Sequence, residues 1–247
     1  MSLTLVSGAI LIAACVEIPT GANDILSFEF APLPSPGVVV GDSLRDTLGV
    51  VKGITLRAFN YSGDEVENPE VTFTAVDRGV RVDGNTGIVL GDSVRASARI
   101  VATVRELSST VTVAVTQRPD TVIGSNDRDS LSYSLTDTAA NISPTIGVRV
   151  LTQSPAGTDS SVASYLVSFL VTSPADTALA RLVSENGGRS SLDTTDARGI
   201  AGRRIKLDVT RLTSLSDSVI VQAFVKHRGV NVRGSPKRLV LKVKPKP

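Results

Sequence analysis

The stretch "STVTVAVTQ", residues 109–117, carries the pattern that decides the fold. Val111, Val113 and Val115 recur at every second position, with threonine or alanine between them. Because successive side chains of a β-strand point to opposite faces, this pattern predicts a strand with one face on an apolar core and the other in water. Valine and threonine are β-branched, and such side chains fit the pleated surface of a sheet.

Alternation of the same kind extends over most of the chain beyond Gly37. It is present in "GITLRAFN" (53–60), "EVTFTAVD" (70–77), "TIGVRVLTQ" (145–153), "YLVSFLVTS" (165–173) and "KRLVLKVK" (237–244). Short segments rich in Gly, Asp, Asn and Pro separate such runs. Many short strands with frequent turns are typical of a β-sandwich, and no stretch shows a sustained helical period, so the sequence predicts an all-β protein.

The composition argues against several classes of function. The 247 residues carry a formal net charge of +2, which gives no reason to expect a nucleic-acid partner. Aromatic residues make up 4%, with no Trp, too few for a platform that stacks bases or sugars. His227 is the only histidine, and we expect it to be a polar residue at a strand end or turn. Since no phosphate-binding loop or nucleophile motif is present, the sequence predicts no cofactor and no catalytic residue.

An uncharged segment from Leu3 to Ala14 precedes the only cysteine, Cys15. Its apolar run is shorter than the roughly 20 residues that cross a bilayer, and it has the length of the apolar part of a signal peptide. The string "LIAAC" (11–15) places two small residues directly before the cysteine. It resembles the signal of bacterial lipoproteins, in which an aliphatic residue and two small residues precede an invariant Cys.

This resemblance implies a lipidation site at Cys15. Residues 1–14 would be a signal peptide that is removed, and the acylated Cys15 would anchor the mature protein in a membrane of the cell envelope. In lipoproteins of diderm bacteria, an Asp after the cysteine tends to retain the protein at the inner membrane. Val16 occupies that place here, which implies the outer membrane. Residues 15–37 contain four prolines, and we expect them to form a tether.

The leader leaves two alternatives open. Met1–Ala14 contains no Lys or Arg, whereas a bacterial leader normally begins with one, so either the true start lies upstream or this leader is atypical. Alternatively, Cys15 is a buried free thiol in an N-terminal strand, which is a common environment for cysteine.

A polar stretch with one proline, "TQRPDTVIGSNDRDS" (116–130), interrupts the alternation near the middle of the chain. We therefore expect a first domain at 38–118, a linker at 119–130 and a second domain at 131–247. Both parts are close to the size of an immunoglobulin-like sandwich, which has about 100 residues.

Each half also resembles a known family. Residues 38–115, with "VVVGDSLRDTLGV" (38–50) and "VRVDGNTGIVLG" (80–91), are similar to bacterial Ig-like domains of group 2, although Phe73 stands where many members carry Trp. Residues 146–244 resemble more loosely the group 1 domains of bacterial adhesins, chiefly through "LDTTDARGIAGRRIKLDV" (192–209). The resemblance implies two tandem immunoglobulin-like β-sandwich domains.

Two groups of charged residues are candidate binding sites. Asp127 and Asp129 lie at the expected domain boundary, where calcium sometimes rigidifies tandem β-domains, but they supply fewer than the six to eight oxygens that calcium takes. The C-terminal run is basic and is a candidate contact for an anionic surface, such as an acidic glycan or lipid headgroups: Arg233, Lys237, Arg238, Lys242 and Lys244. The competing interpretation is a solvated strand whose lysines protect a sheet edge.

The sequence therefore predicts a noncatalytic, envelope-anchored module for adhesion, interaction or spacing, with a membrane contact through its lipid and no nucleic-acid partner. One alternative is a receptor-like module that binds an envelope or host polymer. The other is a hydrolase that uses carboxylates alone, which requires two Asp or Glu residues in one cleft. The partner and the oligomeric state are not determined by the sequence.

Overall fold

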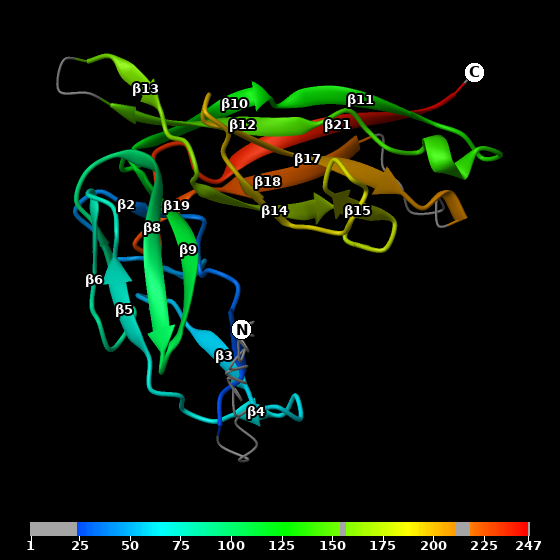
Figure 1. The fold of residues 1–247 in the computed structure, drawn as a ribbon. Coiled ribbons are helices and arrows are strands. Elements are labelled where there is room, and N and C mark those ends of the chain that lie inside the picture. The colour runs from blue at the N-terminus through cyan, green and yellow to red at the C-terminus, as the bar shows by residue number, and fades with distance from the viewer. Residues whose placement is uncertain (1–23, 154–156, 211–217, 247) are drawn as a thin grey trace, which may run out of the picture.

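The computed structural model describes residues 24–153, 157–210 and 218–246. These residues form two β-sandwiches, and the helical residues among them are a 3₁₀ turn, η1 (Thr138–Ala140), and the 3₁₀ residues 209 and 210. The prediction of an all-β protein with two tandem immunoglobulin-like sandwiches is confirmed. The strands of the two sandwiches run in different directions, so the molecule bends where they meet (Figure 1). The predicted signal peptide and Cys15 lie outside the described residues.

The first sandwich contains nine strands. Their bounds are β1 (Ser27–Phe30), β2 (Gly37–Val39), β3 (Leu56–Phe59), β4 (Glu65–Val66), β5 (Thr72–Ala75), β6 (Val80–Val82), β7 (Val89–Gly91), β8 (Arg95–Val104) and β9 (Leu107–Thr116). One sheet has the order β2-β9-β8-β5, a second has the order β1-β3-β4, and β6 pairs with β7.

The second sandwich contains the remaining strands of the described chain. Their bounds are β10 (Thr121–Asn126), β11 (Arg128–Tyr133), β12 (Ile146–Gln153), β13 (Asp159–Ser161), β14 (Leu166–Ser173), β15 (Ala180–Val183), β16 (Leu192–Thr194), β17 (Ile200–Leu207), β18 (Ser218–Phe224), β19 (Lys226–His227), β20 (Val230–Asn231) and β21 (Lys237–Pro245). One sheet has the order β10-β12-β17-β15, with β13 beside β12. The other has the order β11-β21-β18-β14-β16, and β19 and β20 form a small hairpin.

Each sandwich has its own apolar core, built from the positions that the alternation predicted. In β9, Val113 and Val115 are 1% and 2% exposed, while Thr110 and Thr112 before them are exposed to water. In β12, Ile146, Val148 and Val150 are completely buried. Burial of one Val or Ile side chain stabilises a fold by about 1.5–3 kcal/mol, so these rows hold the sheets together without a disulfide.

The first strand of each sandwich is divided between two sheets. In the first sandwich, β1 pairs antiparallel with β3, and the chain then crosses over so that β2 pairs parallel with the last strand, β9. In the second sandwich, β10 pairs antiparallel with β12, and β11 then pairs parallel with the last strand, β21. The two sandwiches therefore share one topology at their N-terminal ends.

This arrangement corrects two expected boundaries. Residues 24–37 were expected to belong to the tether, but they include β1, because Phe28, Phe30 and Leu33 pack against the first core. Residues 119–130 were expected to form a linker, but they contain β10 and the beginning of β11, because Val122 is 2% exposed in the second core. In both places, the crossover between sheets interrupts the alternation that identifies a strand.

One type of turn occurs three times. In each copy, a glycine lies three residues after an Asp or Asn. The side-chain oxygen of Asp46 accepts hydrogen bonds from the backbone N–H of Leu48 and Val50, both 2.9 Å long. Asn60 and Asp196 accept the equivalent pairs of bonds. The glycines at the fourth position have φ values of 84°, 84° and 74°, a region that favours glycine: Gly49, Gly63 and Gly199. The three turns therefore share one hydrogen-bonding pattern and one backbone conformation at the glycine.

The assignment of β1 to the first sandwich gives a stability prediction. Phe28→Ala should lower the free energy of unfolding of the first sandwich by about 1–3 kcal/mol, since its half-buried ring packs on two core clusters. The matched control is Leu26→Ala, because Leu26 lies one residue before β1 and is 46% exposed. Denaturant unfolding of both variants measures the difference. Equal, negligible effects would show that this segment is a tether after all.

Candidate functional site

The two sandwiches meet at a buried carboxylate, Asp42, in the turn that follows β2. Its side chain is 5% exposed. One oxygen accepts a hydrogen bond of 2.9 Å from the backbone of Ser43, and Arg45 donates to both oxygens at 3.0 and 2.9 Å. From the other sandwich, Nε of Arg228 donates to Oδ2 at 2.9 Å. One carboxylate thus bridges two guanidinium groups whose positions are 183 residues apart (228 − 45) in the sequence.

The second sandwich presents Arg228 on the hairpin between β19 and β20. Arg228 and Gly229 have φ values of 51° and 80°, which is the backbone conformation of a tight two-residue hairpin turn. His227 lies at the end of β19, as expected, and its Nε2 is 4.0 Å from Oδ2 of Asp42. The turn therefore directs an imidazole and a guanidinium at the same carboxylate.

Burial and the charges at this junction shift the pKa values of its titratable groups. Burial acts to raise the pKa of Asp42, but the hydrogen bonds from Arg45 and Arg228 outweigh it and hold that pKa well below its ordinary value of 3.8. Burial lowers the pKa of His227 below its ordinary value, and the charge of Asp42 opposes this shift. Burial, together with the charge of Asp42, raises the pKa of Tyr165, whose hydroxyl donates to the carbonyl of Lys226. At neutral pH the junction holds an ionised Asp42 and a neutral His227.

Backbone contacts complete the junction. A Cβ added to Gly49 would overlap the backbone nitrogen of Gly229 and lie 2.7 Å from its Cα, so the Asp46 turn packs directly on the Arg228 hairpin. On the adjoining side, the hydroxyl of Thr116 donates to the carbonyl of Ala163 at 2.6 Å. Only glycine permits the close approach at Gly49, and its positive φ is required by the turn as well.

A cleft of about 60 Å³ lies beside these contacts, lined by residues of both sandwiches that include Asp42, His227 and Tyr165. Its volume admits very few water molecules and no sizeable ligand. Since the carboxylate is already bound by two guanidinium groups, it is not placed to act as a base. The arrangement is suited to fixing the two sandwiches relative to each other.

The carboxylate hydrolase requires a different constellation. Glu67 and Glu70 line one hollow of about 510 Å³ at the far end of the first sandwich, together with Arg105. Both glutamates are exposed. A carboxylic acid that donates a proton to a leaving group needs a desolvated environment that raises its pKa, and an exposed loop does not supply one.

The candidate calcium residues have partners within the protein. Asp127 forms an ion pair of 3.1 Å with Lys237, and Asp129 accepts hydrogen bonds from the side chain of Asn126 and the backbone of Ser130. Within residues 24–153, 157–210 and 218–246, no three His, Cys, Asp or Glu side chains are grouped so that they could hold a metal ion. Calcium at Asp127 and Asp129 remains an untested prediction.

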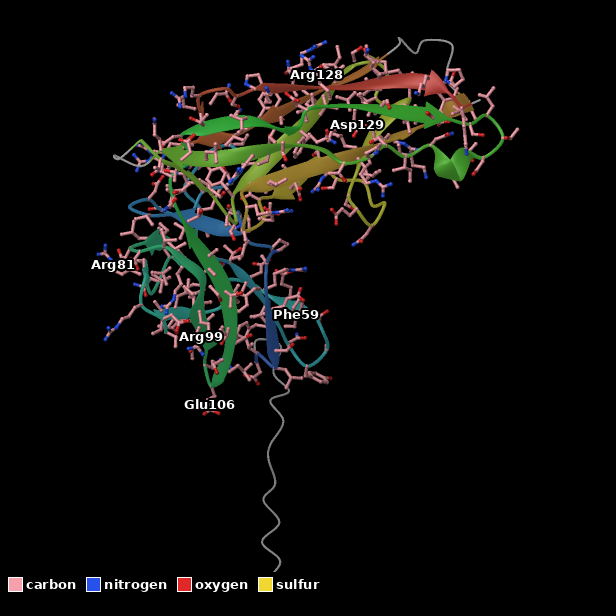
Figure 2. The ribbon with its side chains drawn as sticks, turned by 90° about the horizontal axis from the view of Figure 1, so that it is seen from above. Phe59, Arg81, Arg99, Glu106, Arg128 and Asp129 are labelled. Atoms are coloured by element: carbon pink, nitrogen blue, oxygen red, sulfur yellow. The ribbon has the colours of Figure 1, made fainter. Side chains whose placement is uncertain are left out.

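The structure separates the five basic residues of the C-terminal run into two groups. Arg233 donates to the hydroxyl of Thr121, and Lys237 is paired with Asp127, so these two cations have local partners. The other three are exposed at alternate or near-alternate positions of one strand, β21: Arg238, Lys242 and Lys244. Arg128, which the sequence did not single out, lies on the neighbouring strand β11 (Figure 2).

The sequence did not predict the contact at Asp42 between the two sandwiches. The triplet "GDS" at 41–43 and the turn "DTLG" at 46–49 were visible, but Asp42 and Arg228 are 186 residues apart, and no periodicity links them. The only local signal was a charged residue, Asp42, directly after an apolar strand. This pattern is equally typical of a turn that is exposed to water.

Comparison with known proteins gives only distant similarities. No protein-family model and no curated protein matches the chain. Among solved structures, domains 4 and 5 of the S-layer protein SbsC are similar at 13% identity with a TM-score of 0.33, covering 89% of this chain and 98% of that one. Invasin, a bacterial integrin-binding protein, is similar at 12% identity with a TM-score of 0.31, covering 90% of this chain and 40% of that one. Human protocadherin-24 EC1-2 is similar at 12% identity with a TM-score of 0.26, covering 91% and 100%.

The class of this protein is therefore defined by its own strand order and register: a pair of immunoglobulin-like β-sandwiches joined through an ion pair to a buried carboxylate.

Two glycines with the same turn and the same φ of 84° allow a controlled test of the junction. Gly49→Ala should destabilise the protein by about 2–4 kcal/mol, because strain at positive φ adds to overlap with Gly229. Gly63→Ala should cost only about 1 kcal/mol, since a Cβ there meets nothing within 4 Å. Denaturant unfolding measures the loss of stability in both variants. In addition, the rate of proteolysis near residues 117–120, between the sandwiches, should increase in Gly49→Ala alone. Equal losses in both variants would contradict a tight contact between the sandwiches.

The single histidine makes the junction visible by NMR. We expect the imidazole of untagged protein to titrate with a pKa below 6.5, because burial disfavours its charged form. The folded state then binds fewer protons than the unfolded state, so the contribution of His227 to stability is complete above pH 6.5 and declines as the pH falls below it. In Gly49→Ala the pKa should return towards 6.5, whereas Gly63→Ala should leave it unchanged. A wild-type pKa at or above 6.5 would contradict the buried, neutral imidazole.

Proposed function

We propose that this protein is a noncatalytic interaction and spacer module of a bacterial cell envelope. The observation that carries the proposal is the junction at Asp42, which fixes two sandwiches in one bent arrangement. A spacer must hold its ends at a defined separation and direction. An ion pair with one partner 5% exposed, supported by glycine-to-glycine backbone contact, meets that need better than a flexible linker.

We propose further that Cys15 is the lipid-modified first residue of the mature protein. The support comes from the "LIAAC" string at 11–15 and from the first sandwich beginning by Ser27, which leaves about ten residues between the anchor and the fold. No helix in the described part of the chain is long and apolar enough to cross a membrane. A lipid on Cys15 would provide the attachment, and Val16 after the cysteine favours the outer membrane by analogy with lipoproteins of diderm bacteria.

Adhesion and receptor-like binding differ from a pure spacer only in whether a surface of the sandwiches contacts a partner. Immunoglobulin-like sandwiches bind through end loops, sheet faces or edge strands and need no active site for this purpose. One sheet face of the second sandwich has the chemistry for such a contact.

The anchor can be tested by fractionation of expressing cells. Cys15→Ala should move the protein from the membrane fraction to the soluble fraction, since the thiol that receives the lipid is lost. Val16→Ala is the control and should leave the protein in the outer-membrane fraction. Val16→Asp should shift it to the inner membrane. Membrane association that persists in Cys15→Ala would exclude the lipid anchor.

A further inference from the structure

Four cations form a row on the outer face of one sheet of the second sandwich. In β21, Leu239 and Leu241 are completely buried, so the alternate residues Arg238, Lys242 and Lys244 point outward. Arg128 of β11 lies opposite Val240 in the parallel register and fills the position between Arg238 and Lys242 on the same face. Figure 2 shows Arg128 on the strand that runs along β21. We call these four residues the basic row.

The basic row has no ion-pair partner in the part of the chain that the structure describes. Among residues 24–153, 157–210 and 218–246, none of its members forms an ion pair, whereas neighbouring Lys237 is paired with Asp127. The whole second half shares this excess of positive charge: residues 119–247 contain 17 Lys and Arg and 11 Asp and Glu, a net charge of +6 (17 − 11). Residues 1–118 contain 9 and 13, a net charge of −4 (9 − 13). The modest overall charge thus conceals a strongly basic second sandwich.

Edge protection does not explain these side chains. Lysines on an edge strand discourage pairing with another sheet, and that was the competing interpretation of Lys242 and Lys244. However, β21 is an interior strand that pairs with β11 on one side and with β18 on the other. Lys242 is paired on both sides, with Ser130 and Ser218 opposite it, so it has no edge to protect.

Polar side chains flank most of the row, and two partly exposed apolar residues, Val240 and Ile220, lie at its centre. Ser130 and Ser132 of β11 lie opposite Lys242 and Lys244, and Gln222 of β18 lies opposite Arg238. A strand rises by about 3.3 Å per residue, so Lys242 and Lys244 are about 7 Å apart and the row extends over about 20 Å. An elongated row of cations with hydrogen-bonding groups on both sides matches a chain of repeated anionic groups.

We infer that the basic row binds a linear acidic polymer, one that carries carboxylate, sulfate or phosphate groups along an extended backbone. The contact would be electrostatic, with the hydroxyl and amide groups beside the row binding the polymer backbone. A bilayer surface is less suitable, because a membrane contact gains from fully exposed aromatic or large apolar side chains beside the cations. Ser130, Ser132 and Gln222 lie beside the cations, and the apolar residues at the centre of the row, Val240 and Ile220, are only partly exposed. This inference names the partner of the proposed interaction module and rests on that proposal for its biological setting.

The test measures binding of the full chain, carrying Cys15→Ser so that it stays unlipidated, to immobilised polygalacturonate and dextran sulfate, with neutral dextran as the blank. Lys242→Glu/Lys244→Glu should weaken binding at least tenfold. Lys242→Gln/Lys244→Gln should give a smaller loss. The matched control, Arg189→Glu/Lys206→Glu, makes the same change in net charge on the turn after β15 and on β17, away from the row, and should change affinity by less than threefold. Circular dichroism confirms that each variant remains folded.

Salt supplies a second measurement. Raising the ionic strength from about 50 to about 200 mM should weaken binding to the acidic polymers by tenfold or more, as expected when several cations displace condensed counterions. Equal losses in the charge-reversal variant and its matched control would overturn the inference, as would equal binding to neutral dextran. Stronger binding to phosphatidylglycerol vesicles than to either polymer would overturn it in favour of a membrane contact. Anchoring through Cys15 is measured separately, so the polymer site and the lipoprotein proposal can fail independently.

Discussion

The arrangement of this molecule depends on one buried carboxylate. Asp42 is removed from water almost completely, and an ionised carboxylate in that environment is stable only if cations and hydrogen-bond donors replace its hydration. Arg45 and Ser43 supply part of this replacement from the same sandwich, and Arg228 supplies the rest from the other. Separation of the sandwiches would therefore leave Asp42 with a weaker set of partners. The half-exposed Arg228 keeps the net energy of the bridge modest, so its main effect is to select one orientation.

The close contact beside Asp42 depends on the backbone conformation of two turns that are far apart in the sequence. The Asp46 turn and the Arg228 hairpin each place a glycine at positive φ, and the two glycines meet. Any larger residue at Gly49 would push the hairpin away and move Arg228 from the carboxylate. Side-chain electrostatics and backbone packing are thus two parts of one contact, and neither is sufficient without the other.

The sequence predicted the interior of each sandwich well and its boundaries poorly, for one physical reason. Period-two alternation is a property of a strand that stays in one sheet, as in β9 and β12, and the buried positions of these strands were identified correctly. The first strand of each sandwich changes sheets, which breaks the alternation at Pro32 to Pro36 and again at Asn126 and Asp127. From the sequence pattern alone, these two crossovers resemble a tether and a linker. A strand that is divided in this way cannot be found from periodicity alone.

The site residues also differ in how far the sequence reveals them: strand alternation indicates some, and only the tertiary fold brings the others together. Exposure of Arg238, Lys242 and Lys244 follows from alternation within β21, so a charged face was predictable, but Arg128 joins them only through the parallel pairing of β11 with β21, more than a hundred residues away. The same long-range pairing makes β21 an interior strand and removes the edge-protection argument for Lys242. Asp42 and Arg228 are likewise connected only by the tertiary fold.

The two charged regions also respond differently to their surroundings. The basic row is exposed, so ions at physiological strength screen it within about 8 Å, and any contact it makes is adjustable by salt. Asp42 is buried, and its bonds to Arg45 and Arg228 are screened far less. Changes in ionic strength would therefore release a polymer from the second sandwich while the bend between the sandwiches persists. A module built in this way can lose and regain its partner without losing the geometry that presents the binding face.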